Sequence, residues 1–261
     1  MTWRFAAAKA QGTSHVRDDL PCQDAYACLT VPHGEATALV VAVSDGAGSA
    51  PEGAAGAAHI CATLSGLLAK GFEQAPLGEA WLREHVAQVR TTLLEEALSL
   101  QLPPRQLAAT LLFAVLGPDW SAFAQVGDGA IVTSEPGTGE WSWLFWPQRG
   151  EYANTTTFLT DASALDNLEV AFLEHGQQEV AVFTDGLQHL VLDYQAQTVH
   201  SPFFERMIHP VRNSAVEGED VELSRGLATY LHSDTVRSRA DDDLTLVLAS
   251  SLTAEDCAAA G

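Results

Sequence analysis

The chain has 261 residues, of which 34 are acidic and 13 basic, giving a formal charge of −21. Hydrophobic residues make up 47% and charged residues 18%, which is typical of a folded globular protein and not of a disordered one. The acidic charge argues against nucleic acid or an anionic membrane surface as the main partner, because both need a clustered basic face.

No low-complexity linker or internal repeat divides the chain, so residues 1–261 are expected to form a single domain. The four cysteines are irregularly spaced and include no C-x-x-C pair, which indicates reduced thiols and not a disulfide scaffold. The N-terminus lacks the apolar segment of a signal peptide, and no apolar run approaches the roughly 18 residues of a membrane span. A soluble, cytoplasmic monomer is therefore expected.

The first half of the chain predicts strands followed by two helices. Strands are expected over residues 3–8, 25–31 and 39–43, with a turn at 32–34. A first helix should begin near Pro51 and stop at Gly71, and apolar residues spaced by three and four predict a second over 77–100.

The second half of the chain predicts mainly strands, with one helical region before the last strand. Strands are expected over 108–116, within 121–134, and over 141–146, 180–183 and 244–249, with a tight connection at 135–140. Residues 147–167 are polar and irregular, which favours a surface loop or lid. Residues 201–232 should be helical with an acidic break at 217–220.

Asp45 ends the apolar strand at 39–43 and is followed by Gly46 and Gly48. A single Asp-Gly is more often only a turn. Here, however, aspartates recur at predicted strand ends along more than two hundred residues: Asp24, Asp45, Asp128, Asp185 and Asp242 or Asp243. Carboxylates that converge from separate elements suit Mg²⁺ or Mn²⁺, whereas no Cys or His cluster has the spacing of a zinc site.

Other chemistries lack their motifs. The chain has no G-x-S-x-G nucleophile elbow and no G-x-x-x-x-G-K-[ST] phosphate loop, and the pair Gly46 and Gly48 lacks the third glycine of a dinucleotide site. A water activated by a metal ion is the nucleophile that this residue set favours.

Six segments together carry a resemblance to a known family. They are CQDA at 22–25, VSDGAGS at 43–49, ATLLFAV at 109–115, QVGDGAIV at 125–132, FTDGL at 183–187 and DDLTLVLA at 242–249. In this order, over about residues 8–250, they resemble the metal-dependent serine/threonine phosphatases of the phosphatase 2C family. The resemblance implies an α+β fold: a β-sandwich of two antiparallel sheets flanked by helix pairs, four layers in all, with metals at one end.

The resemblance also implies roles for individual residues. Asp45 would bridge two metals, and the carbonyl of Gly46 would bind the second. Asp185 and Asp242 would complete the first metal site, which makes Asp45 and Asp185 the residues closest to catalysis. Among the remaining residues, Asp24 would hold metal-bound water, Asp128 would form a weaker third site with Asp185, and Asp243 and Thr110 would orient the ligands from behind.

The implied function is hydrolysis of phosphoserine and phosphothreonine in phosphoproteins by a water activated between two Mn²⁺ or Mg²⁺ ions. The partners would be phosphoproteins, a Ser/Thr kinase or its targets. Three departures from the family pattern stand out: Gln23 replaces a glutamate, Ala47 replaces a histidine, and the place of a phosphate-binding arginine falls on His15, with Arg17 further on. The changes at Gln23 and His15 leave open an alternative, a catalytically weak pseudophosphatase that binds phosphorylated partners or regulates a kinase.

Overall fold

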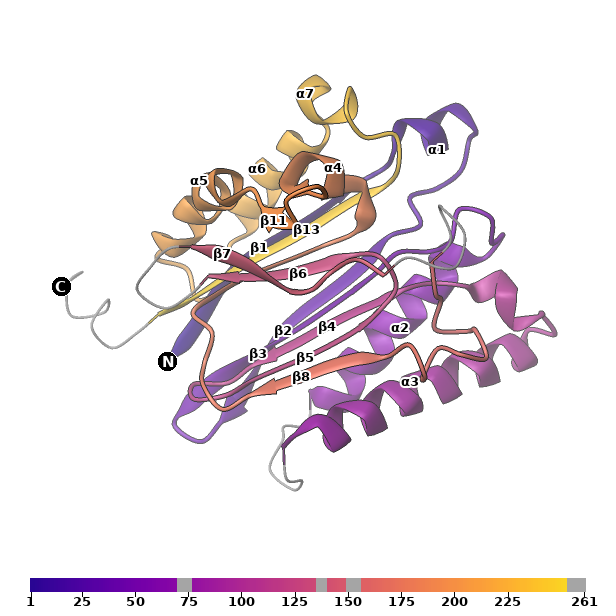
Figure 1. Ribbon diagram of the computed structural model, residues 1–261, viewed down its shortest axis with the longest axis horizontal. Helices are drawn as coiled ribbons and strands as arrows, with labels where there is room; N and C mark the ends of the chain where they lie inside the picture. Colours follow the sequence, from indigo (N-terminus) through magenta and orange to yellow (C-terminus); the bar gives the residue numbers. More distant parts are fainter. Residues whose placement is uncertain (70–76, 135–139, 149–155, 253–261) are drawn as a thin grey trace.

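The computed structural model describes residues 1–69, 77–134, 140–148 and 156–252, arranged as two packed β-sheets between two layers of helices (Figure 1). The first sheet has the order β12 (Gly218–Glu219), β1 (Thr2–Ala10), β13 (Leu244–Leu252), β9 (Glu179–Phe183), β6 (Ala130–Ser134) and β7 (Trp141–Phe145). The second has the order β2 (Ala25–His33), β3 (Ala36–Ser44), β4 (Leu111–Leu116), β5 (Ser121–Val126) and β8 (Glu169–Leu173). All neighbouring strands are antiparallel except β1 and β12.

Helices cover the outer face of each sheet. The second sheet carries α2 (Gly53–Leu68) and α3 (Glu79–Ser99), and the first carries α5 (Ser201–Arg212) and α6 (Val221–Leu231). Shorter elements are α1 (Thr13–Arg17), α4 (Gln188–Val191), α7 (Asp234–Arg237) and the small ladder of β10 (Leu192–Asp193) with β11 (Thr198–Val199). This α+β architecture is the four-layer sandwich that the family resemblance implied.

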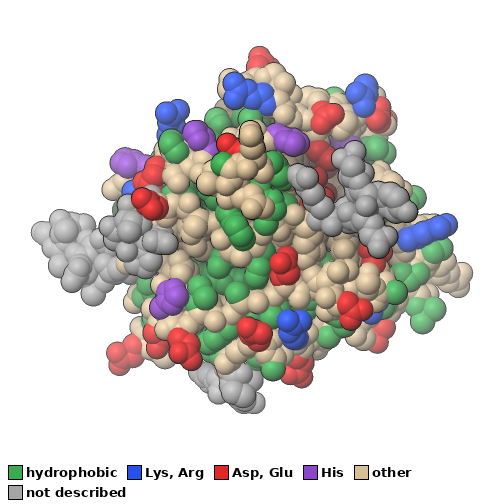
Figure 2. All heavy atoms as spheres, viewed as in Figure 1, with side chains coloured by type: hydrophobic (Ala, Val, Ile, Leu, Met, Phe, Trp, Pro, Cys, Tyr) green, Lys and Arg blue, Asp and Glu red, His purple; other side chains and the backbone are tan. Residues whose placement is uncertain are grey.

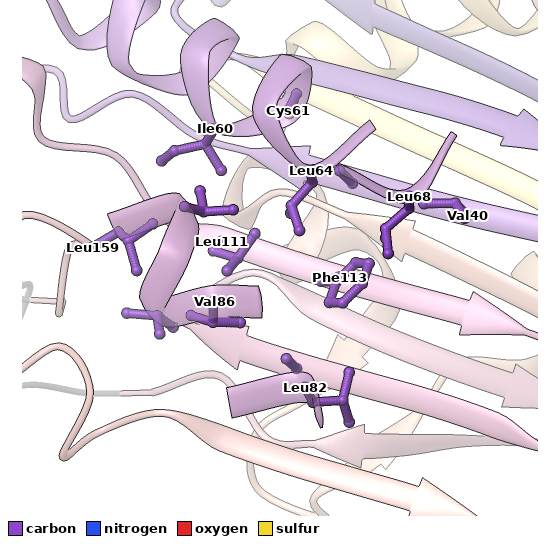
Figure 3. Packing of buried hydrophobic residues seen from close by; sticks show 14 of the residues in the cluster. Val40, Ile60, Cys61, Leu64, Leu68, Leu82, Val86, Leu111, Phe113 and Leu159 are labelled. Carbon is purple, nitrogen blue, oxygen red and sulfur yellow. The ribbon is translucent and has the colours of Figure 1, made fainter. Parts of the chain in front are cut away.

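The position of β3 between α2 and the other sheet explains why its sequence is an unbroken apolar run. Val40 and Ala42 face α2, whereas Leu39, Val41 and Val43 face the other sheet, so both faces of the strand are buried. Figure 3 shows the core between this sheet and its helices, where Leu64 and Leu68 of α2 lie over Phe113 and Ile60 lies on the side of Leu111 and Leu159. A third core joins the first sheet to α5 and α6.

The structure confirms the predicted strands at 3–8, 25–31, 39–43 and 244–249, both helices before residue 100, and the break between α5 and α6. The turn predicted at 32–34 is confirmed at Gly34, whose φ is +61°, but it begins later than predicted because β2 continues through His33. Pro32 is tolerated in β2 because that strand lies at a sheet edge. Strand β8 and helix α1 were not predicted.

Residues 156–167 form an irregular loop, as predicted for 147–167, but this part of the segment is anchored in the core and does not lie only on the surface. Leu159 and Ala164 are fully buried in the core that contains α2 and α3, and the amide of Leu159 donates to the carbonyl of Ala109 at 2.9 Å. Apolar anchors in an otherwise polar run hold this part of the segment against the domain. Residues 149–155, and the connection at 135–139, lie outside the described residues.

Acidic side chains are spread over the face seen in Figure 2, with few lysines or arginines among them. None of the helices in the described ranges is both long and apolar enough to cross a membrane. Cys22, Cys28 and Cys61 are unpaired thiols, and burial raises the pKa of Cys22 and of Cys61 to about 12.

Candidate metal centre

The aspartates singled out in the sequence come from neighbouring strand ends. Asp24 precedes β2 and Asp45 follows β3, and these strands pair Ala25 with Ser44. Asp185 follows β9 and Asp242 precedes β13, whose register pairs Phe183 with Leu246. Asp128 lies in the turn between β5 and β6, and β6 also pairs with Phe183 through Ala130. The antiparallel registers therefore bring five carboxylates to one end of the sandwich.

Burial and mutual repulsion raise the pKa of the carboxyl groups of Asp24, Asp45, Asp128 and Asp185. Burial is the largest cause in each case, and it raises the pKa of Asp24 and of Asp185 to about 7. The pKa of Asp45 lies well above its usual range, because burial is reinforced by the charges of Asp24, Asp185, Asp242 and Asp128, in that order. Burial and then the charge of Asp242 raise the pKa of Asp128. The site concentrates negative charge that bound cations would offset.

Two threonines hold one oxygen of Asp24. Thr184 and Thr245 donate their hydroxyls to Asp24 Oδ2 at 2.8 and 2.7 Å, and the amide of Thr245 donates to Thr184 Oγ1 at 3.0 Å. All three residues are buried, and Asp24 Oδ1 has no hydrogen-bond partner. These contacts link the two sheets and leave one carboxylate oxygen available. Sequence analysis missed both threonines, although each lies within two residues of a predicted site aspartate.

The main chain of Asp45 is held by its neighbours in the sheet. Thr110 Oγ1 accepts a hydrogen bond from the Asp45 amide at 3.0 Å, and the Thr110 amide donates to the Asp45 carbonyl at 2.8 Å. Ser44 Oγ donates to the Thr110 carbonyl at 2.5 Å. The structure thus brings Thr110 directly behind Asp45, where it fixes the strand end that carries the carboxylate.

Two of the glycines that follow aspartates are required by close approach. A Cβ on Gly46 would lie 2.4 Å from the carbonyl carbon of Gly53, and one on Gly186 would lie 2.1 Å from the carbonyl oxygen of Asp243. Any side chain would push these segments apart, since real Cβ contacts are longer than this. The Asp-Gly pairs at 45–46 and 185–186 therefore serve the packing of the site as well as the turns.

Asp243 is a buried anchor for the segment before β2. Its Oδ1 accepts from the Gly12 amide at 2.7 Å, and its Oδ2 accepts from the Gln23 amide at 2.6 Å. Its Oδ2 also lies 2.8 Å from His15 Nδ1. Because the ring of His15 is buried and a Cβ on Gly48 would lie 3.7 Å from His15 Nε2, the imidazole faces the glycine turn.

The other predicted residues differ in their surroundings. Arg17 is exposed and pairs with Asp18 at 3.1 Å, and among the described residues it makes no hydrogen bond to a site aspartate. Gln23 is buried, with Nε2 donating to the Ala50 carbonyl at 3.2 Å and Oε1 left without a partner. Sequence analysis also missed Gln188, which donates to the Asp128 carbonyl and accepts from the Tyr194 hydroxyl.

The residues present suit a hard divalent cation. Within the described ranges, no three His, Cys, Asp or Glu side chains already form a closed ligand group. Nevertheless Asp24 Oδ1 and Asp185 Oδ1 are buried oxygens without hydrogen-bond partners. They belong to a cluster of aspartates whose side chains offer a metal ion only oxygen ligands. Mg²⁺ and Mn²⁺ prefer such donors and keep several waters, so a complete protein cage is not required.

The sequence matches a known protein family and a named protein. The model of the family described as Protein phosphatase 2C matches residues 11–232. Serine/threonine-protein phosphatase 3 of Escherichia coli (strain K12) is 35% identical over 252 residues, which are 95% of this chain and 98% of that protein.

Solved structures share the architecture at low sequence identity. Serine/threonine phosphatase Stp1 from Staphylococcus aureus gives a TM-score of 0.63 at 13% identity, covering 97% of this chain and 96% of that one. RsbX, solved in complex with magnesium, gives 0.57 at 13% identity, with 95% of each chain covered. Because the family model spans most of the sequence and the Escherichia coli phosphatase is matched along nearly its whole length, this chain belongs to the protein phosphatase 2C family.

Proposed function

We propose that this chain, as a single domain, hydrolyses phosphoserine and phosphothreonine in phosphoproteins that Ser/Thr kinases produce. The observation that carries the proposal is the convergence of five aspartates from separate strand ends, two of them with buried, unpartnered oxygens. Membership of a metal-dependent phosphatase family supports it, as does the similarity to a named serine/threonine-protein phosphatase.

The aspartates would hold two Mn²⁺ or Mg²⁺ ions, with Asp45 shared between them. Asp185 and Asp242 would serve the first site, the Gly46 carbonyl and Asp24 the second, and Asp128 a weaker third. Bound divalent cations supply a water of lowered pKa and positive charge for the phosphoryl oxygens.

The chain's own contribution is positioning. Thr184 and Thr245 orient Asp24, while Thr110 fixes the main chain of Asp45. His15, held by Asp243, would offer Nε2 to a phosphoryl oxygen. These groups are fixed before substrate arrives, so little reorganisation is needed during the reaction.

The test uses the purified full chain with p-nitrophenyl phosphate and with matched phosphoserine, phosphothreonine and phosphotyrosine peptides. Activity should require Mn²⁺ or Mg²⁺, disappear with EDTA, return when metal is restored, and favour the phosphoserine and phosphothreonine peptides. If calorimetry shows bound Mn²⁺ but no substrate is turned over, the phosphatase proposal fails and the pseudophosphatase alternative replaces it.

Thr245→Val should weaken metal binding while keeping the shape of the side chain. The variant removes one of the two hydroxyls that hold Asp24, and partners behind a metal ligand typically change affinity by about 10 to 100-fold. Calorimetric titration with Mn²⁺ should show this loss, and Thr245→Ser should restore most of the affinity. Thr229→Val, on the exposed face of α6, is the control. Equal affinities for wild type and Thr245→Val would refute the positioning role.

Gln23→Glu should have opposite effects with and without metal. A carboxylate at this position would lower the Mn²⁺ concentration for half-maximal activity by about tenfold, within the range expected for a partner behind the ligands. The same change removes the Nε2 donor to the Ala50 carbonyl and buries a charge, so the metal-free protein should melt at a lower temperature.

Gln101→Glu provides the matched control, because this exposed glutamine lies just after α3 and takes the same charge change. Superimposable Mn²⁺ titrations for wild type and Gln23→Glu would show that residue 23 does not tune the metal and is only part of the packing.

A further inference from the structure

The two helix layers differ in one respect. On one side α2 and α3 pack directly against each other, whereas on the other side α5 and α6 leave a groove of about 220 Å³ between them. Ala6 of β1 and Leu248 of β13 form its floor, in agreement with the position of α5 and α6 over these strands in Figure 1. The walls are Arg206, Met207, Pro210 and Val211 from α5, and Leu223, Gly226, Leu227 and Tyr230 from α6.

Gly226 keeps the α6 wall open. It lies inside the helix and is exposed, and a Cβ built on it would meet no atom within 4 Å. Packing therefore does not require a glycine at position 226. Helix propensity does not favour one either, because glycine is less favourable than alanine inside a helix. The missing side chain does, however, leave room beside Leu223 and Leu227 on the same wall.

Two arginines lie close to the groove. Arg206 lines the groove, and both Arg206 and Arg239 act electrostatically on Tyr230. In the part of the chain that the structure describes, Arg212 and Arg225 form ion pairs with glutamates, whereas Arg206 and Arg239 form none. Two uncompensated cations beside an apolar groove are notable in a chain of charge −21, and they are complementary to an anionic group.

The size of the groove limits the ligand to a small molecule. A cavity of about 150 Å³ holds benzene, which has six carbons, so 220 Å³ corresponds to about eight or nine carbons. We propose that the groove between α5 and α6 is a binding site for a medium-chain carboxylate such as octanoate. The alkyl chain would lie along Leu223, Gly226 and Leu227, with the carboxylate toward Arg206 and the Tyr230 hydroxyl.

The first experiment is a calorimetric titration of the full chain with straight-chain carboxylates of six to twelve carbons, below their micelle concentrations. Each methylene that enters the groove should tighten binding by about fourfold, and the gain should stop at about eight or nine carbons. Octanol should bind more weakly than octanoate, and Arg206→Gln should remove that difference. No saturable binding, or an affinity independent of chain length, would overturn the proposal.

The second experiment fills the groove. Gly226→Leu should lower octanoate affinity at least tenfold, whereas Gly66→Leu, at an exposed helical glycine in α2 with equally open space, should leave it unchanged. Circular dichroism of both variants checks the fold. Wild-type affinity in Gly226→Leu contradicts the site. A wild-type dimer in analytical ultracentrifugation that Gly226→Leu dissociates would instead assign the groove to a second copy of the chain.

Discussion

Asp45→Asn is expected to abolish hydrolysis and, at the same time, to raise the melting temperature of the metal-free protein. Loss of partners behind a metal ligand costs about 10 to 100-fold, so loss of a ligand shared by two ions should lower kcat/KM by more than about 100-fold. Without metal, however, the half-buried Asp45 carboxylate lies near four other aspartates, and each of their charges raises its pKa further. Replacing it with a neutral amide of similar shape removes this repulsion.

The two effects separate a functional role from simple misfolding. Assays with Mn²⁺ should give the loss of activity, and thermal unfolding in EDTA at pH 8 should show a rise of at least about 2 °C, since 1 kcal/mol shifts the midpoint of a protein of this size by roughly 2–4 °C. Asp119→Asn is the control, because this exposed aspartate follows β4 at the opposite end of the sandwich. Activity within tenfold of wild type, or a lower melting temperature, would reject the assignment of Asp45.

The site could be predicted from the sequence because the same feature, an aspartate at the end of a predicted strand, recurs along the chain. Each of the predicted aspartates lies within two residues of a strand end, and antiparallel pairing then brings Asp24 near Asp45 and Asp185 near Asp242. The buried strands could also be predicted, because both faces of a strand such as β3 are apolar and its segment therefore contains few polar residues. The sandwich itself followed only from the family resemblance.

The supporting contacts could not be predicted, because they join residues that are distant in the chain. Thr184 and Asp24 are separated by 160 positions, and a threonine beside a strand has no sequence signal for the carboxylate it binds. The same holds for the contact of Gly186 with the Asp243 carbonyl. The anchoring of the loop at 156–167 was missed for a different reason: its polar composition conceals Leu159 and Ala164, which are fully buried.

The stability of the metal-free protein should fall as the pH rises from 5 to 8. Burial raises the pKa of Asp24 from 3.8 to about 7 in the folded chain, so between these values the folded state binds more protons than the unfolded state. Stability therefore decreases as the pH rises from 5 to about 7, by at most roughly 3 kcal/mol from Asp24 alone, and changes little above that. Asp185, whose pKa is also raised to about 7, acts in the same direction.

Carboxylates with lowered pKa values cannot mask this decrease in stability with rising pH. The Arg17 side chain lowers the pKa of Asp18, and the Ser214 hydroxyl lowers that of Asp220, so their contributions change only below about pH 4. Bound cations favour the ionised carboxylates and should remove or reverse the slope. The stabilisation by Mn²⁺ should therefore increase with pH, from small at pH 5 to large at pH 8.

Thermal unfolding of wild type and Asp24→Asn, in EDTA and in saturating Mn²⁺, measures the slope over pH 5–8. The difference between the two proteins isolates Asp24 from histidines and other groups that titrate in this range. Asp24→Asn should flatten the EDTA curve, because its amide still accepts from Thr184 and Thr245 but has no proton to lose. Parallel curves for the two proteins in EDTA would show that Asp24 is ionised in the metal-free fold, and that the carboxylates are kept charged without a cation.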